Sequence, residues 1–230
     1  MIKSFTPKME ILYPPQQRLW PELSPAADLG FVLYGGTAIA LQLGHRSSVD
    51  FDFFTEIPLN RKELFNTFPF LQQSIVIQDL PNSLSALVPY GNYEHEHVKI
   101  SFFGTIDNGR VGEPLLTSDG VMQVASLDDL MATKAKVILQ RVEAKDYRDV
   151  AAMVKAGVSI AKGLAAARKM YGLSFQPSES LKAMVYFEGG DLHTLNEDEK
   201  IILVKAVATV RDLPDVDITL GPLAIPALQI

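Results

Sequence analysis

The sequence predicts an α+β protein, with a small mixed sheet in the first half of the chain and helices alone in the second half. Short apolar runs that are typical of strands lie before Gly104. From Leu127 onward the apolar residues recur with helical spacing instead. Strands followed by helices indicate an α+β lobe joined to a helical lobe. Because Leu116–Gly120 is rich in turn residues, we expect lobes of residues 1–120 and 121–230.

The first lobe alternates strand and helix signals. A helix is expected at Thr37–Leu43, which contains almost no helix breakers, and another at Leu64–Phe68, where Asn60 and Glu63 are placed to cap it. A turn signal, Pro81-Asn82, separates two of the apolar runs. The expected strands are Phe31–Tyr34, Asp50–Phe54, Ser74–Ile77, Leu84–Val88 and Val98–Phe103.

The second lobe is predicted to contain four helices and an irregular tail. Ser126 with Asp129, and Asn196 with Glu199, have the spacing of helix caps. The tail after Asp212 is apolar and contains three prolines, so we expect it to lie over the body without forming a helix. The predicted helices are Leu127–Ala156, Ser159–Tyr171, Ser180–Phe187 and Glu197–Leu213.

The composition is that of an ordinary globular protein. Of the 230 residues, 47% are hydrophobic and 21% are charged, which excludes wholesale disorder. No apolar run reaches the roughly 18 residues of a membrane span, no secretory signal is evident, and cysteine is absent, so we expect a cytoplasmic protein without a membrane segment. The net charge of −6 means that any nucleic acid must be bound by local clusters of cations.

The alternation of Asp50 and Asp52 with Phe51 and Phe53 indicates a half-buried strand. A strand places residues i and i+2 on one face, about 6.6 Å apart, so both carboxylates point the same way. Because adjacent carboxylates repel, a hard divalent cation such as Mg²⁺ or Mn²⁺ between them best explains the pair. In the alternative interpretation, the two aspartates merely accept hydrogen bonds from neighbouring backbone.

The glycine pair Gly35-Gly36 comes directly after a predicted buried strand and at the start of a predicted helix. Backbone N–H groups at a helix N-terminus, together with the helix dipole, favour a bound phosphate. A phosphate site followed by two carboxylates indicates metal-dependent phosphoryl or nucleotidyl transfer. Either motif alone is common; their combination, with thirteen residues between Gly36 and Asp50, is more specific.

This spacing resembles the pattern of the nucleotidyltransferase superfamily. The fuller segment, with His45-Arg46-Ser47-Ser48 before Asp50-Phe51-Asp52-Phe53-Phe54, resembles the AbiEii/AbiGii-type toxin family within it. The resemblance implies a small nucleotidyltransferase-like sheet that carries the acids, followed by a helical lobe. The residues expected to bind a nucleoside triphosphate in this block are Gly35, Gly36, Thr37, Arg46 and Ser48.

A second block also resembles the toxin family. Lys134 lies on a predicted helix, Arg141 follows it, and Asp146 and Asp149 complete an Asp-x-x-Asp ending. By resemblance, Lys134 would contact the triphosphate. Asp146 or Asp149 would orient it or assist the incoming hydroxyl, with Asp149 the expected catalytic residue. Pairing between charges on a helix surface explains Asp146 and Arg148 equally well.

One departure from the superfamily pattern concerns a third acid on a later strand. The matching strand here has Lys99 and Ser101 at the alternating positions. A shift in register would bring Glu96 near, or Asp149 would be recruited from the helical lobe; otherwise Asp50 and Asp52 hold a single cation. His95 and His97 share a strand face, but two histidines are an incomplete zinc site, and an exposed strand edge explains them better.

Lys134, Arg141, Lys145 and Arg148 would form a basic stripe within an arc of about 60° on one continuous helix. The stripe is either an RNA-binding surface or a solvated helix face. The resemblance implies a bacterial toxin that transfers a nucleoside monophosphate to RNA, with tRNA as one candidate, and that is paired with an antitoxin protein. Two alternatives stay open: a non-catalytic module of the same fold that binds a nucleotide or a partner, and a transferase with a small-molecule acceptor.

Overall fold

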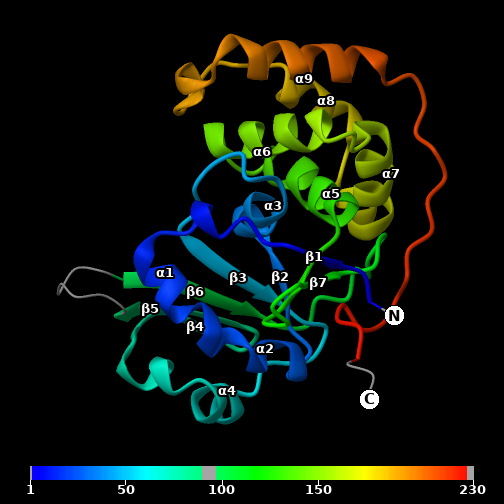
Figure 1. Cartoon of the computed structure of the whole chain (residues 1–230). Coiled ribbons are helices and arrows are strands. Elements are labelled where there is room, and N and C mark those ends of the chain that lie inside the picture. Colours follow the sequence, from blue (N-terminus) through cyan, green and yellow to red (C-terminus); the bar gives the residue numbers. More distant parts are fainter. Residues whose placement is uncertain (1, 90–96, 227–230) are drawn as a thin grey trace. The chain divides into compact units, whose positions relative to one another are not determined.

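The computed structural model describes residues 2–89 and 97–226, and the chain forms two compact units (Figure 1). The first unit comprises Met1–Gly109, Glu113–Ala125 and Leu220–Ile230, and the second comprises Arg110–Gly112 and Ser126–Thr219. These bounds differ from the predicted lobes, residues 1–120 and 121–230, because the main division falls at residue 125 and the C-terminal tail returns to the first unit.

A mixed sheet forms the centre of the first unit. Within the described residues it has the strand order β1-β7-β8-β2-β3-β6-β5-β4. The central strand β3 pairs with β2 antiparallel and with β6 parallel. All five predicted strands are present, whereas three strands of only two or three residues were missed because so short a run has no readable period. The bounds are β1 Ser4–Phe5, β2 Val32–Tyr34, β3 Asp50–Phe54, β4 Ile75–Leu80, β5 Ser83–Pro89, β6 His97–Phe103, β7 Leu115–Thr117 and β8 Gln123–Val124.

Aromatic rings fill the core on one face of this sheet. The ring of Phe53 on β3 stacks on Phe102 of β6, with centroids 5.5 Å apart, and both side chains are fully buried. Trp20, which directly follows α1 (Pro14–Leu19), packs against Phe51 on the same face. Phe68, which directly follows α4 (Arg61–Thr67), packs against Phe102. Helices α1 and α4 therefore cover the same face of the sheet (Figure 1).

The second unit consists of helices. Helix α5 packs against α6 and α7, and α9 packs against α6 and α8. Both predicted caps are confirmed: the Ser126 side chain accepts from the Asp129 N–H, and Asn196 and Glu199 form a reciprocal capping box. The bounds are α5 Leu127–Val137, α6 Ala144–Lys155, α7 Ile160–Tyr171, α8 Pro177–Met184 and α9 Glu197–Thr209.

The prediction of one continuous helix from Leu127 to Ala156 is wrong. Helix α5 ends at Val137, and α6 begins only at Ala144. In a continuous helix, Lys134 and Asp146 would be separated by about 18 Å along the axis, yet their side chains lie 2.6 Å apart. The break lets α6 fold back onto α5. Residues 138–143 contain no glycine or proline and would allow the helix to continue, so we attribute the break to the buried ion pair.

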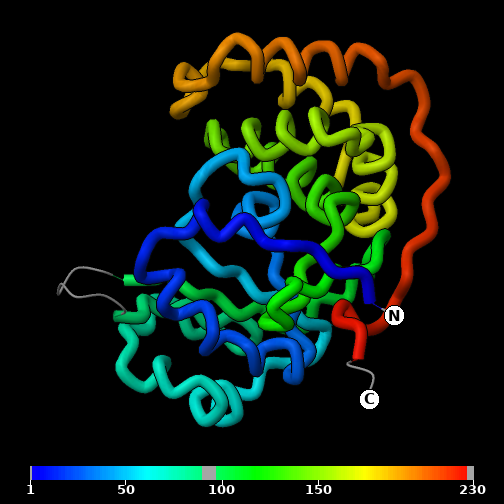
Figure 2. Tube along the Cα trace, viewed as in Figure 1, coloured from blue at the N-terminus to red at the C-terminus, as the bar shows by residue number. Residues whose placement is uncertain are grey.

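The C-terminal tail contains no helix in the described residues, as predicted, and Figure 2 shows it leaving α9 as an extended trace. Its end is fixed to the first unit by polar contacts. The buried Gln123 side chain donates to the Ile225 carbonyl oxygen at 2.6 Å and accepts from the Ile225 N–H at 2.8 Å. The Leu223 N–H donates to Glu56 at 3.0 Å. Among the described residues, none of the helices is both long and apolar enough for a membrane span.

Candidate active site

Strand β3 presents Asp50 and Asp52 on one face and Phe51 and Phe53 on the other. The two phenylalanines have no exposed surface, whereas the two aspartates are half-buried. This is the arrangement expected from the i, i+2 spacing. The rings fix the strand in the core, so the carboxylates project from a rigid element toward the face that remains accessible.

A tight turn at Gly35 connects β2 to α3 (Gly35–Leu43) next to these carboxylates. Gly35 has a φ of +74°, a conformation that glycine adopts at little cost. A Cβ at this position would lie 2.8 Å from Oδ2 of Asp52. Gly35 is therefore the position that requires glycine, because its φ is positive, whereas the φ of Gly36 is not. Together they begin a helix whose N-terminal N–H groups suit an anion.

Thr37 and Ser48 are buried, with exposed fractions of 2% and 7%. The Thr37 hydroxyl donates to Oγ of Ser48 at 2.7 Å and also contacts the carbonyl oxygen of Asp50. These bonds hold α3 against the start of β3, which positions Asp50. Arg46, in the same connection, is half-buried and donates to the Ser47 carbonyl oxygen. Contact of Thr37, Arg46 and Ser48 with a nucleotide stays a prediction.

Strand β6 runs beside β3 and carries no acid next to the aspartates, as the sequence indicates. In the parallel register, Asp50 lies opposite Lys99 and Asp52 opposite Ser101. The Lys99 ammonium is 3.9 Å from Oδ2 of Asp50. The suggested third acid Glu96, and the zinc candidate His95, lie outside the described residues. The described residues contain no group of three or more His, Cys, Asp or Glu side chains that could hold a metal ion.

The Asp50–Asp52 pair fits Mg²⁺ or Mn²⁺ better than a softer metal. Both ligands are carboxylate oxygens on a half-buried face, and Mg²⁺ is commonly bound through one or two carboxylates while keeping several waters. The Gly35 backbone approaches Asp52 so closely that a Cβ would lie 2.8 Å from Oδ2, so this carboxylate lies beside the helix start. The residues therefore fit a single hard cation.

A second cluster of predicted site residues lies in the second unit, where α5 and α6 meet. The Lys134 ammonium contacts Asp146 at 2.6 Å and Asp149 at 2.7 Å. Arg141 binds Asp146 through two nitrogens, at 2.8 and 3.0 Å. The side chains of Asp146 and Asp149 have no exposed surface and that of Lys134 has 5%, whereas that of Arg141 is 44% exposed. The cluster is therefore a buried ion network with one accessible guanidinium.

The charges around Asp146 decide its protonation. Burial by itself raises the pKa of this carboxyl. The hydrogen bond from Arg141 and the positive charge of Lys134 outweigh burial, so the pKa of Asp146 is held below its ordinary value of 3.8. Asp146 is consequently an anion in the folded protein at neutral pH, and its charge depends on both partners.

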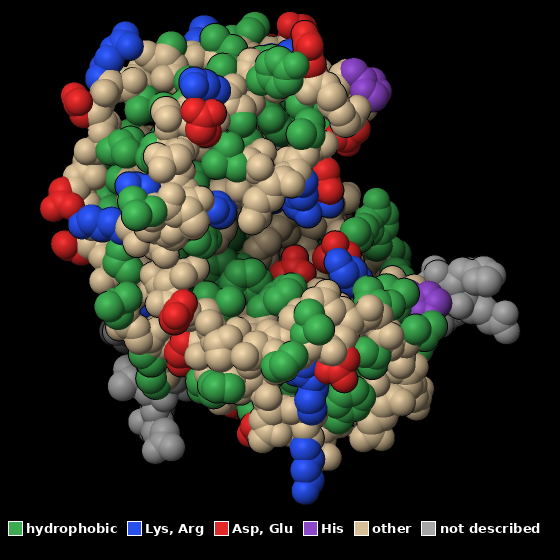
Figure 3. Space-filling view, turned by 180° about the vertical axis from the view of Figure 1, so that it is seen from behind, with side chains coloured by type: hydrophobic (Ala, Val, Ile, Leu, Met, Phe, Trp, Pro, Cys, Tyr) green, Lys and Arg blue, Asp and Glu red, His purple; other side chains and the backbone are tan. Residues whose placement is uncertain are grey.

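The predicted basic stripe is wrong as a geometric feature, because the helix that would carry it is broken between α5 and α6. Its members also have separate partners. Lys145 pairs with Glu143 at 2.8 Å, and Arg148 donates to the Thr194 carbonyl oxygen at 2.6 Å. On the face of the described residues drawn in Figure 3, basic and acidic side chains are interspersed without a continuous basic patch.

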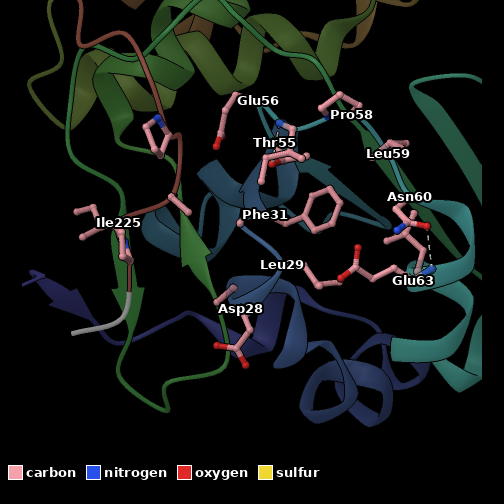
Figure 4. A pocket seen from close by; sticks show the side chains of 17 residues that line it. Asp28, Leu29, Phe31, Thr55, Glu56, Pro58, Leu59, Asn60, Glu63 and Ile225 are labelled. Carbon is pink, nitrogen blue, oxygen red and sulfur yellow. Dashed lines mark hydrogen bonds between the residues drawn. The ribbon is translucent and has the colours of Figure 1, made fainter. Parts of the chain in front are cut away.

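A cavity of about 520 Å³ in the first unit was not predicted from the sequence (Figure 4). Thr55, the residue that follows the C-terminal end of β3, lines it, whereas Asp50 and Asp52 do not. Phe31 forms part of its wall, and in Figure 4 the carboxyl group of Glu63 extends toward Phe31. Its walls come from residues 27–31, 55–64 and 222–226, segments too far apart in the chain for a local motif to reveal them.

Comparisons with known proteins agree with this architecture. A family model described as "Nucleotidyl transferase AbiEii toxin, Type IV TA system" matches residues 23–205. An uncharacterised protein of Aquifex aeolicus (strain VF5) is 31% identical over 160 residues, which are 69% of this chain and 74% of that protein.

Among solved structures, an antigenic nucleotidyltransferase-like protein from Paracoccidioides brasiliensis is similar with a TM-score of 0.51 and 14% identity, over 84% of this chain and 94% of that one. At this identity the likeness shows the fold alone. Family and fold together support nucleotidyltransferase activity in general. Since the family model spans both motif blocks and most of the sequence, this chain belongs to the AbiEii nucleotidyltransferase toxin family.

Proposed function

We propose that this chain transfers a nucleoside monophosphate from a nucleoside triphosphate to an acceptor hydroxyl, in a reaction that depends on Mg²⁺ or Mn²⁺. The observation that carries the proposal is the pair of carboxylates, Asp50 and Asp52, on one face of β3 beside the first turn of α3. The pair supplies oxygen ligands for a hard cation, and the turn supplies backbone N–H groups for a phosphate.

The residues of the first unit have distinct roles in this proposal. Asp50 and Asp52 hold the cation, which when bound neutralises phosphate charge and polarises the phosphoryl oxygens. The N–H groups of Gly35 and Gly36 bind a phosphate oxygen at the start of α3. Thr37 and Ser48 position the acids, because their hydroxyls fix α3 to the strand that carries Asp50 and Asp52.

In the second unit, we propose that Lys134 acts through its neighbours. Its ammonium lies between Asp146 and Asp149, so it holds both carboxylates in place. Arg141 is fixed by two hydrogen bonds to Asp146 and remains 44% exposed. Arg141 also lies 3.6 Å from a carboxylate oxygen of Glu143. Arg141 has the most exposed side chain of this cluster, and it keeps its predicted contact with the triphosphate in the proposal. Asp149 has no exposed surface, so we propose that it acts by pairing with Lys134.

RNA, with tRNA as one candidate, is the proposed acceptor, and a cognate antitoxin is the proposed partner. The antitoxin follows from the toxin–antitoxin description of the family, and the RNA acceptor follows from the resemblance of the two sequence blocks to the toxin family. Two observations favour the alternatives. The separate partners of Lys145 and Arg148 weaken the case for a continuous RNA surface and favour a small-molecule acceptor. The absence of an acid at Lys99 and Ser101 favours a non-catalytic nucleotide-binding module.

Incubation with each α-labelled nucleoside triphosphate and total RNA, with and without Mg²⁺, tests the proposal. We expect Mg²⁺-dependent label on RNA, abolished in Asp50→Asn and retained in Asp79→Asn. Asp79 lies on β4, and its carboxylate pairs with Arg61 of α4. Label on a small molecule instead of RNA would support the second acceptor class. Triphosphate binding without transfer would support the module, and the absence of triphosphate binding would contradict the proposal.

A further inference from the structure

Strand β6 places a positive charge beside the acidic pair of β3. In the parallel ladder, Lys99 lies opposite Asp50, and side chains at paired positions of neighbouring strands point to the same face. The Lys99 ammonium is 3.9 Å from Oδ2 of Asp50, and the two side chains are 39% and 33% exposed. Lys99 is thus part of the same accessible face as the carboxylates.

The position opposite Asp52 supplies no further charge. It is Ser101, which is fully buried and whose hydroxyl accepts a hydrogen bond from the Ser85 hydroxyl at 3.1 Å. The two aspartates and the two positions opposite them therefore combine two carboxylates with one ammonium. Two carboxylates balance the charge of one divalent cation. Before a triphosphate binds, two divalent cations would leave an uncompensated positive charge, to which Lys99 would add.

We propose that this site binds one divalent cation and that Lys99 supplies the second positive charge to the triphosphate, in the place that a second metal ion takes in two-metal enzymes. The inference rests on the proposed function and adds a positioning and charge-supplying residue to it. A lysine ammonium is a compact point charge that suits phosphate. Because it is fixed on a central strand, its location next to Asp50 does not depend on a loop.

This arrangement has an unusual consequence: Lys99 repels the metal and attracts the triphosphate. Removing its charge should therefore change the two affinities in opposite directions. A cation about 2.1 Å from Oδ2 of Asp50 would lie at most about 6 Å from the ammonium, given the 3.9 Å contact. At that distance in a medium close to water, a unit charge and a divalent charge change an affinity by roughly tenfold.

Titration calorimetry with two probes tests the inference. MnCl₂ alone measures the metal affinity, and inorganic tripolyphosphate in saturating Mn²⁺ measures the phosphate affinity without a choice of nucleobase. Lys99→Met keeps the aliphatic stem and should bind Mn²⁺ roughly tenfold tighter and tripolyphosphate roughly tenfold weaker. Lys99→Arg should restore both affinities, whereas Lys62→Met, which removes an exposed charge from α4, should change neither.

The outcomes separate this inference from the proposed function. We expect the wild type to bind one Mn²⁺ per chain and Asp52→Asn to lose it. If Lys99→Met changes the two affinities no more than Lys62→Met does, or if the wild type binds two Mn²⁺ that Asp52→Asn loses, the role of Lys99 is wrong while the metal site stands. If the wild type binds no Mn²⁺, the metal site is wrong, and both proposals fail together.

Discussion

Replacement of Lys134 by Met should destabilise the second unit strongly. The change removes the cation that contacts Asp146 at 2.6 Å and Asp149 at 2.7 Å, and neither carboxylate has exposed surface. Removing one partner of a buried ion pair costs about 3–5 kcal/mol, because a buried charge loses its compensation. Asp146 keeps its two hydrogen bonds from Arg141, so we expect a loss near the middle of this range, about 4 kcal/mol.

The expected change in melting temperature depends on how much of the chain unfolds together. Unfolding entropy is about 2.1 cal/mol/K per residue. If all 230 residues unfold as one, a loss of about 4 kcal/mol lowers the midpoint by about 8 °C. If the second unit, with roughly 100 residues, unfolds alone, the shift is about 20 °C. The size of the shift therefore also measures the coupling between the units.

Two spectroscopic signals separate these cases. Far-UV circular dichroism follows the helices, and fluorescence of the single tryptophan, Trp20, follows the first unit, where its side chain is 3% exposed. Lys169→Met is the matched control. Its ion pair with Asp215 has the same length, 2.6 Å, but the two side chains are 45% and 88% exposed, and exposed pairs contribute little. Equal midpoints for Lys134→Met and Lys169→Met would refute the reasoning from burial.

The same variant should alter the dependence of stability on pH. In the wild type, the lowered pKa of Asp146 contributes stability that is present above the ordinary value of 3.8 and is lost as the pH falls through the folded-state pKa. Lys134→Met removes part of this lowering. The difference in unfolding free energy between wild type and variant should therefore be largest at neutral pH and become smaller in acid, as urea titrations at several pH values can show.

Two further predictions concern the first unit. Gly35→Ala should lower the unfolding free energy by about 1–3 kcal/mol and also weaken Mn²⁺ binding, because the new Cβ would lie 2.8 Å from Oδ2 of Asp52. The control Gly44→Ala, also at a positive φ but against the side chain of Lys8, should lower stability without changing the Mn²⁺ affinity. Equal effects of the two variants on the Mn²⁺ affinity would contradict a direct role for the turn. Gln123→Leu should release the tail from both of its hydrogen bonds to Ile225, so limited proteolysis should remove the tail faster than in the wild type; unchanged cleavage would mean that other contacts suffice to hold it.

The elements of the first site follow from local sequence. The alternation at Asp50–Phe53 is a property of strand geometry, and the turn at Gly35 needs a residue without a side chain, so both can be predicted from the residues themselves. The register of β6 on β3 also agrees with the sequence, since Lys99 and Ser101 occupy the alternating positions. The alternation alone does not predict that the Lys99 ammonium lies close to the Asp50 carboxylate, because this contact depends on which strands become neighbours.

The ion cluster between α5 and α6 could not be predicted from local sequence. The residues 138–143 contain no helix breaker, and their helical pattern continues into α6, so a single helix was the reasonable prediction. The break is caused by contacts between side chains twelve positions apart, Lys134 and Asp146, whose burial no local pattern reveals. The cavity near Phe31 has the same character, because its walls come from three distant segments.

The path of the chain through the two units has a consequence for its synthesis. The first unit is built from three separate stretches, and the last of them, Leu220–Ile230, follows the whole of the second unit in the sequence. On the ribosome, the sheet can therefore pair its strands early, but the cavity wall formed by residues 222–226 is added only after all the helices have emerged. A nascent chain that stalls before residue 220 would carry the acidic pair of β3 while Gln123 still lacks the backbone that it binds. The proposed metal ligands are therefore synthesised before the unit that contains them is complete.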